Sequence, residues 1–244
     1  MDESVAQKHA TLVVQEVIRL LGQAGPDPQL VIDPDLRPEG KAGPLVRSLA
    51  GYVAYYERWS LNWEMQALLR AAPIAGDTEL GLAFCDLINP IRWPKAGVSD
   101  HAIREIRTLK ARMESERLPR GADPKTHFKL GLGGLADVEW TVQLVQLQHA
   151  WEFEGLRTTG TIAALTAAGE AGFIPTSDVE PLTGAWTFTS SLGNAAMLWR
   201  GRPVVEVPSD LQDAEGIGRT VGSETGQGVE LAGSSSRPGR PRNT

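Results

Sequence analysis

Apolar side chains recur every three or four residues through most of this chain, and no other feature constrains its fold as strongly. Such spacing gathers apolar residues on one face of a helix. It predicts helices over residues 5–22, 45–71, 77–89, 99–117, 136–149, 158–172 and 178–200. The 99–117 helix begins after Ser99, a favoured N-cap residue. The 136–149 helix is apolar on two faces, so we expect it to be buried on most sides at the centre of a mainly α fold.

One short segment departs from the helical pattern. Residues 30–32, Leu-Val-Ile, are apolar and β-branched, and they lie between a proline-broken linker at 25–28 and a turn-rich segment at 37–44. This composition predicts a strand. A lone strand leaves its backbone groups without hydrogen-bond partners, so the pattern implies either an unrecognised partner strand or a missing piece of sheet.

The composition excludes several classes of protein. A single cysteine among 244 residues excludes a disulfide scaffold and a cysteine-based zinc site. The sequence has no apolar run of about 18 residues that would span a membrane, and its acidic start lacks the apolar core of a signal peptide. The net charge of −6 argues against bulk nucleic-acid binding. We therefore expect a cytoplasmic globular protein with no nucleic-acid or membrane partner.

Asp33, Asp35 and Arg37 follow the predicted strand. If the backbone stays extended through Pro34, the two carboxylates point to the same face and could hold Mg²⁺. The alternative is a turn in which the aspartate side chains bond to the local backbone. A guanidinium so close to carboxylates either pairs with them or binds a phosphate.

A glycine-rich segment, with Lys129, Gly131, Gly133 and Gly134, leads directly into the 136–149 helix. Backbone N–H groups in such a loop can bind an anion, helped by the helix dipole. The segment is neither a Walker A loop nor a dinucleotide-binding motif, because it lacks the spacing of both. A tight turn before a packed helix explains the same residues without a ligand.

Three further acids are candidates of uncertain role. Asp137 and Glu139 open the 136–149 helix but lie on different faces, so they do not chelate one ion as a pair; acids in a first turn also favour the helix dipole. Glu64 lies in an aromatic-rich helical stretch, where we expect it to be buried with a cationic partner such as Arg58 or Arg70.

Three segments in order carry a resemblance to a known family. They are VIDPDLRPEGKAGPLVRSL (31–49), YYERWSLNWEMQALLRAAPIAGD (55–77) and EIRTLKARMESERLPRGADPKTHFKLGLGGLADVEWTVQLVQLQHA (105–150). These segments closely resemble the bifunctional glutamine synthetase adenylyltransferase/adenylyl-removing enzymes, in particular the C-terminal, adenylylating half of the actinobacterial members. The match runs from about residue 2 to about residue 208.

The resemblance implies transfer of AMP from ATP, with Mg²⁺, to a tyrosine of glutamine synthetase, and it makes a PII signalling protein a further candidate partner. It implies that Asp33 is a catalytic, metal-binding carboxylate, whereas Asp35 falls on a variable position. It also places Arg37 and the segment Lys129, Gly131, Gly133 and Gly134 at the nucleotide, and it leaves Asp137, Glu139 and Glu64 uncertain.

The chain also departs from the family pattern. The family's Gly-Ser and Asp-x-Asp carboxylate motif is absent, and Leu132 stands where related sequences often carry Arg. We therefore expect residues 1–44 to be the remnant of an α/β nucleotidyltransferase domain, 45–208 a helical-bundle domain and 209–244 a tail of low order. The isolated chain is then expected to be nearly inactive. The alternative is a non-catalytic helical module that binds glutamine synthetase or a PII protein.

Overall fold

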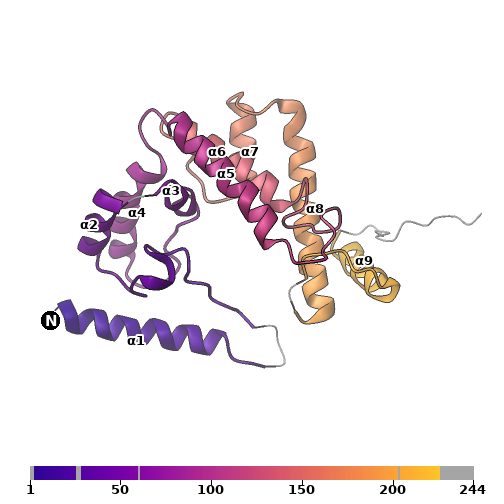
Figure 1. Cartoon of the computed structure of the whole chain (residues 1–244), viewed down its shortest axis with the longest axis horizontal. Coiled ribbons are helices and arrows are strands. Elements are labelled where there is room, and N and C mark those ends of the chain that lie inside the picture. The colour runs from indigo at the N-terminus through magenta and orange to yellow at the C-terminus, as the bar shows by residue number, and fades with distance from the viewer. Residues whose placement is uncertain (1–2, 26–28, 60, 203, 226–244) are drawn as a thin grey trace, which may run out of the picture.

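The computed structural model describes residues 3–25, 29–59, 61–202 and 204–225, and within these ranges the regular elements are all helices (Figure 1). The mainly α prediction is confirmed. The elements are α1 (Glu3–Leu21), the 3-10 helix η1 (Gly40–Ala42), α2 (Leu49–Trp59), α3 (Asn62–Leu68), α4 (Thr78–Arg92), α5 (Asp100–Arg117), α6 (Leu135–His149), the 3-10 helix η2 (Glu154–Leu156), α7 (Thr161–Glu170), α8 (Thr176–Arg200) and α9 (Leu211–Thr225).

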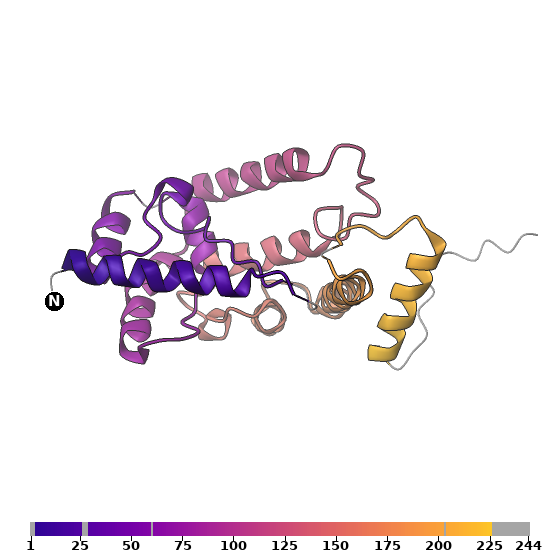
Figure 2. The same cartoon turned by 90° about the horizontal axis from the view of Figure 1, so that it is seen from below.

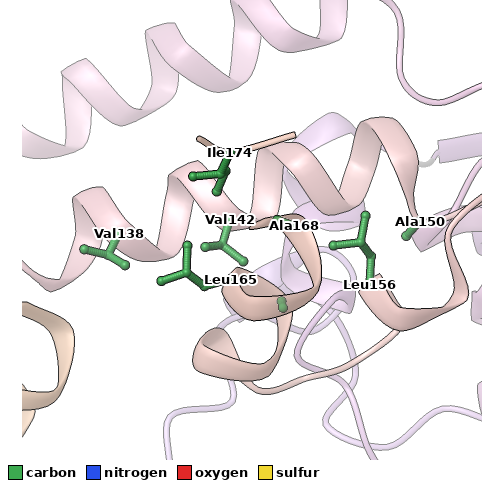
Figure 3. Packing of buried hydrophobic residues seen from close by; sticks show 8 residues of the cluster. Val138, Val142, Ala150, Leu156, Leu165, Ala168 and Ile174 are labelled. Atoms are coloured by element: carbon green, nitrogen blue, oxygen red, sulfur yellow. The ribbon is translucent and has the colours of Figure 1, made fainter. Parts of the chain in front are cut away.

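Helix α6 is the centre of the packing, as its two apolar faces predicted. It contacts α3 on one side and α7 and α8 on the other. Figure 3 shows Val138 and Val142 of α6 together with Leu165 of α7, and these side chains are at most 3% exposed. Leu147, near the end of α6, belongs to a second cluster with side chains of α5 and of the end of α3. Because α6 belongs to both clusters, it joins the α3–α5 part of the molecule to the α7–α8 part.

The α8–α9 pair shows that the predicted low-order tail is wrong for residues 211–225. Ile217 and Val221 of α9 are fully buried against α8. The two helices approach closely at Gly216, where an added Cβ would lie 2.3 Å from the Trp199 ring. Small residues permit this contact, and they also keep the apolar content of the segment low, which is why the pattern did not indicate a helix. The remaining tail, 226–244, lies outside the described residues.

Helix α1 lies along one side of the molecule, apart from the packed helices in Figure 1 and in front of them in the view from below (Figure 2). Its contacts with the rest include a hydrogen bond that Gln7 Nε2 donates to the Val46 carbonyl at 2.9 Å. Its apolar residues are not covered: Leu12 is 63% exposed, Val13 62% and Leu20 51%. This helix therefore presents an unpartnered apolar face within the described structure.

The predicted strand at 30–32 is not formed. Residues 29–34 have no regular secondary structure, and Leu30 and Val31 are 65% and 79% exposed. The physical reason is the absence of a partner: among the described residues the only β-type pairing is an isolated antiparallel bridge between His127 and Glu206. The structure therefore contains no α/β remnant in the described part of residues 1–44. Among all the residues that the structure describes, no helix is long and apolar enough to cross a membrane.

Candidate functional site

Asp33 lies in a solvent-exposed turn that its own side chain helps to form. Its Oδ1 accepts a hydrogen bond from the Asp35 amide at 2.9 Å, which is the local turn geometry that the sequence left open as an alternative. Asp35 instead turns toward cations, with Oδ2 3.3 Å from Lys41 Nζ and Oδ1 3.8 Å from Arg37 Nη1. The two carboxylates therefore have different partners, and Asp33 is the one without a cation beside it.

The Arg37 side chain stabilises this turn through hydrogen bonds to backbone carbonyls. Its guanidinium donates to the Pro34 carbonyl at 2.8 Å and to the Gly43 carbonyl at 3.1 and 3.2 Å, and a weaker bond reaches Lys41 O at 3.3 Å. A guanidinium bound to three carbonyls holds the 34–43 segment closed. In this arrangement Arg37 sets the position of the turn that carries Asp33.

The glycine-rich segment is held by contacts within the chain. The amides of Gly131, Gly134 and Leu135 donate to the carbonyls of His127, Gly131 and Phe128 at 2.7, 2.9 and 3.0 Å. An added Cβ on Gly131 would lie 2.1 Å from Pro124 O, and one on Gly134 would lie 2.8 Å from Phe128 O. Gly133 has a φ of +74°, a left-handed conformation that favours glycine. Backbone packing therefore explains these three glycines without a ligand, while the neighbouring Lys129 side chain is exposed.

Asp137 ties this segment to α5. Its Oδ2 accepts from the Gly133 amide at 2.7 Å, and its Oδ1 accepts from Lys110, which also contacts Glu114. Burial acts to raise the pKa of Asp137, but the hydrogen bonds from Lys110 and Gly133 outweigh it and hold the pKa below its usual value. The sequence pattern did not indicate Lys110, because its partner lies on another helix 27 positions away.

Glu139, on another face of α6, pairs with Arg70, which lies in the turn just after α3. Arg70 Nη2 lies 2.8 Å from Glu139 Oε1, and Arg70 Nη1 donates to Thr159 O at 2.7 Å. One turn along the same interface, Gln66 Nε2 donates to Gln143 Oε1 at 2.7 Å. Arg70 follows Gln66 by four residues and Glu139 precedes Gln143 by four, so polar contacts join α3 and the turn after it to α6.

Glu64 is buried, as expected, but the predicted cationic partner is wrong. The side chain is 2% exposed and accepts hydrogen bonds from Tyr55 Oη at 2.7 Å and from the Leu61 amide at 2.9 Å. Burial and the Glu64 contact together raise the pKa of Tyr55. Glu64 therefore joins α2 to the first turn of α3, and Arg70 is engaged elsewhere.

The structure brings the candidate residues together in two groups. Asp33, Asp35 and Arg37 share the segment between α1 and α2, whereas the glycine segment lies between α5 and α6, beside α8, and Asp137 is in the first turn of α6. Glu64 and Glu139 belong to neither group, because each has partners of its own. The two segments lie apart in the view of Figure 1. Over the described ranges, no three His, Cys, Asp or Glu side chains are grouped to hold a metal ion. Asp33 thus fits Mg²⁺ only as one ligand of a larger set.

Comparisons with known proteins agree with the resemblance seen in the sequence. The family model described as glutamate-ammonia ligase adenylyltransferase matches residues 1–86, and the model described as GlnD PII-uridylyltransferase matches residues 107–232. Among curated proteins, the bifunctional glutamine synthetase adenylyltransferase/adenylyl-removing enzyme of Streptomyces avermitilis is 57% identical over 222 residues, which are 91% of this chain and 22% of the relative. The enzymes of the same name from Streptomyces coelicolor and Mycobacterium avium are 54% and 49% identical over 94% and 95% of this chain, and 23% of each relative.

The chain thus spans less than a quarter of the length of these relatives. The two family models together span every candidate site residue described above. Two family models match successive parts of the chain, and about half of the residues are identical to these relatives over more than nine-tenths of this chain. The chain therefore belongs to the family of bifunctional glutamine synthetase adenylyltransferase/adenylyl-removing enzymes, whose members are nucleotidyltransferases.

Proposed function

We propose that this chain takes part in the ATP-dependent transfer of AMP to a tyrosine of glutamine synthetase, and that by itself it is nearly inactive. The observation that carries the first part is the 48–57% identity to enzymes of that name across most of the chain. The observation that carries the second is the donor set, since Asp33 is a single exposed carboxylate without a neighbouring acid free to share a metal.

In this proposal Asp33 supplies one oxygen ligand to Mg²⁺, and Arg37 holds the turn that presents it. A bound Mg²⁺ would neutralise charge on the triphosphate. The remaining metal ligands would come from elsewhere in a longer protein, because the described residues do not supply them. This chain's own contribution is therefore the placement of one carboxylate on a closed turn.

Lys129 is the residue of the glycine segment best placed to meet a phosphate. Its side chain is exposed beside the start of α6, whereas the neighbouring amides of Gly131, Gly133 and Gly134 already donate within the chain. The glycines then give the segment its shape, and the ammonium supplies the charge. In this reading Asp137 and Glu139 fix the α6 end of the site to α5 and α3.

The exposed face of α1 supports a role within a longer protein. Leu12, Val13 and Leu20 are more than half exposed, and they lie near the exposed, apolar residues Leu30 and Val31 in sequence. Such a face usually marks an interaction surface. We infer that further chain, of the kind that makes up the rest of the relatives' length, covers it.

The proposal is tested with purified chain of 244 residues in two assays. The first measures AMP transfer from ATP to glutamine synthetase, where we expect no transfer above background. The second measures ATP binding by calorimetry with and without Mg²⁺, where we expect weak, Mg²⁺-dependent binding that Asp33→Ala abolishes and Asp86→Asn, an exposed acid on α4, leaves unchanged.

Each assay has an outcome that contradicts the proposal. Efficient transfer that depends on Asp33 would show that the chain is catalytically complete. Absence of ATP binding in a folded, helical sample would favour the second function, a non-catalytic module that binds glutamine synthetase or a PII protein in the cytoplasm. The match of residues 107–232 to the PII-uridylyltransferase model favours that second function, because it runs from within α5 through α9 and excludes Asp33.

A further inference from the structure

A hollow of about 360 Å³ opens at the C-terminal end of α4, outside the two groups of candidate residues. Its size lies at the lower end of the range for small-molecule sites, about 300–1,000 Å³. One wall comes from the end of α4 and the residues after it, and the other from the segment between α6 and α7. The lining residues are Asn89, Pro90, Trp93, Lys95, Trp151 and Arg157.

Two guanidinium groups lie over the Trp93 ring and a lysine lines the same hollow, and no carboxylate of the described residues pairs with these cations. The Arg92 guanidinium carbon is 4.2 Å from the centroid of the Trp93 ring, and that of Arg157 is 5.5 Å away. Lys95 lies two residues after Trp93 on the rim. Among the ion pairs formed by the described residues, none includes any of these three side chains.

The two guanidinium groups are fixed by uncharged acceptors. Arg92, only 6% exposed, donates to Asn89 Oδ1 at 2.8 and 3.1 Å and to Ala71 O at 2.9 Å. Arg157 donates to the carbonyls of Ala150 and Trp151, both at 2.8 Å. Arg92 also contacts the Cys85 side chain, but no carboxylate of the described residues pairs with it. Buried charges in proteins are normally paired, so a buried arginine without a carboxylate partner leaves a positive field at this place.

Among the side chains that line the hollow, the polar groups still able to hydrogen-bond are donors. The Trp93 indole N–H is buried and has no acceptor, and the Asn89 side-chain oxygen is already occupied by Arg92. The Asn89 amide nitrogen and Lys95 Nζ are therefore left as donors beside it. An unsatisfied buried N–H is costly, and an acceptor that reached it from the hollow would remove that cost.

We propose that this hollow binds an oxyanion, a phosphate or carboxylate group carried on a small flat apolar body. The oxyanion would accept from Lys95 and from the Trp93 N–H, in the field of Arg92 and Arg157. The flat body would lie against the Trp93 and Trp151 rings, which supply the apolar part of the lining. This site is separate from Asp33 and from the glycine segment.

The test titrates the 244-residue chain by calorimetry with three probes of similar shape: phenyl phosphate, benzoate and uncharged benzyl alcohol. We expect one or both anions to bind and benzyl alcohol to bind at least tenfold more weakly. Lys95→Gln, at an exposed position, is expected to weaken anion binding about tenfold. Trp93→Phe keeps the apolar ring but removes the N–H, and it should also weaken the anions selectively. The matched control is Lys125→Gln, an exposed lysine in the segment between α5 and α6, which should leave binding unchanged.

The results distinguish phosphate from carboxylate binding, and anion binding from binding by apolar shape alone. Binding of phenyl phosphate alone assigns the site to phosphates, binding of benzoate alone assigns it to carboxylates, and binding of both supports any oxyanion of this size. Equal binding of benzyl alcohol would overturn the proposal, because the hollow would then select only apolar shape. It is also overturned if neither anion binds, or if anion binding is the same in Lys95→Gln and Lys125→Gln. Asp33→Ala should not change anion binding, so this result is independent of the proposed transferase role.

Discussion

The contact between Tyr55 and Glu64 gives a quantitative test of how α2 is joined to α3. Glu64 is 2% exposed and has two donors, the Tyr55 hydroxyl at 2.7 Å and the Leu61 amide at 2.9 Å. Hydrogen bonds to charged groups contribute about 1.5–3 kcal/mol. We therefore expect Tyr55→Phe to lower the free energy of unfolding by about that amount. Glu64→Leu keeps a side chain of similar size but removes both acceptor oxygens, so the bonds from Tyr55 and from the Leu61 amide are both lost.

The double variant should be less destabilised than the sum of the two single variants. The expected coupling energy is about 1.5–3 kcal/mol, because each single change already removes the shared contact. Urea unfolding followed by circular dichroism measures all four proteins, with Tyr52→Phe as control, since no hydrogen bond ties the Tyr52 hydroxyl to Glu64. A coupling energy within about 0.5 kcal/mol of zero would refute the reasoning, because the two side chains would then act independently.

Three further predictions concern the glycine segment, its acid and α1. Gly131→Ala should lower the free energy of unfolding by about 3 kcal/mol because its Cβ meets backbone oxygen, whereas Gly133→Ala should cost about 1 kcal/mol for its positive φ; equal losses in urea unfolding would contradict this. Asp137 has a depressed pKa, so its charge stabilises the fold above the pKa of the unfolded chain and this effect is lost as pH falls through the folded pKa. Asp137→Asn should therefore destabilise the fold at pH 7, by an amount that shrinks as pH falls through the depressed pKa of Asp137, and a difference independent of pH would contradict it. Replacement of both Leu12 and Val13 by Ser should leave the free energy of unfolding within about 0.5 kcal/mol and reduce self-association measured by sedimentation; a large loss of stability would show that this face is covered.

Local signals in the sequence predicted most of the helical fold. The N-cap at Ser99 is confirmed, since its hydroxyl accepts from the Ala102 amide at 3.2 Å. The central place of α6 followed from apolar residues on two faces, because such a helix has to be covered on both sides. The predicted 45–71 helix is instead two helices, α2 and α3. The hydrogen bond that the Leu61 amide donates to the Glu64 carboxylate marks where the second helix begins.

Tertiary partners decided the elements that the pattern missed. Residues 30–32 have β-branched composition, but a strand is stable only where a neighbouring strand satisfies its backbone, and the described chain offers none there. Helix α9 shows the opposite case, because its burial depends on a close approach at Gly216 that hydrophobicity does not signal. Both differences arise from what lies beside a segment, and a single sequence does not record that.

The candidate site illustrates the same point in chemical terms. A glycine that frees a backbone amide for a phosphate and a glycine that lets two backbone segments touch look identical in sequence. In this chain Gly131 and Gly134 do the second, because an added Cβ would overlap carbonyl oxygens, and the Gly133 amide already donates to Asp137. A nucleotide approaching this segment would therefore meet the Lys129 side chain and the closed loop rather than a row of free amides. If the family chemistry uses this segment, substitution of Lys129 should weaken ATP binding while leaving stability unchanged, whereas substitution of Gly131 should lower both together.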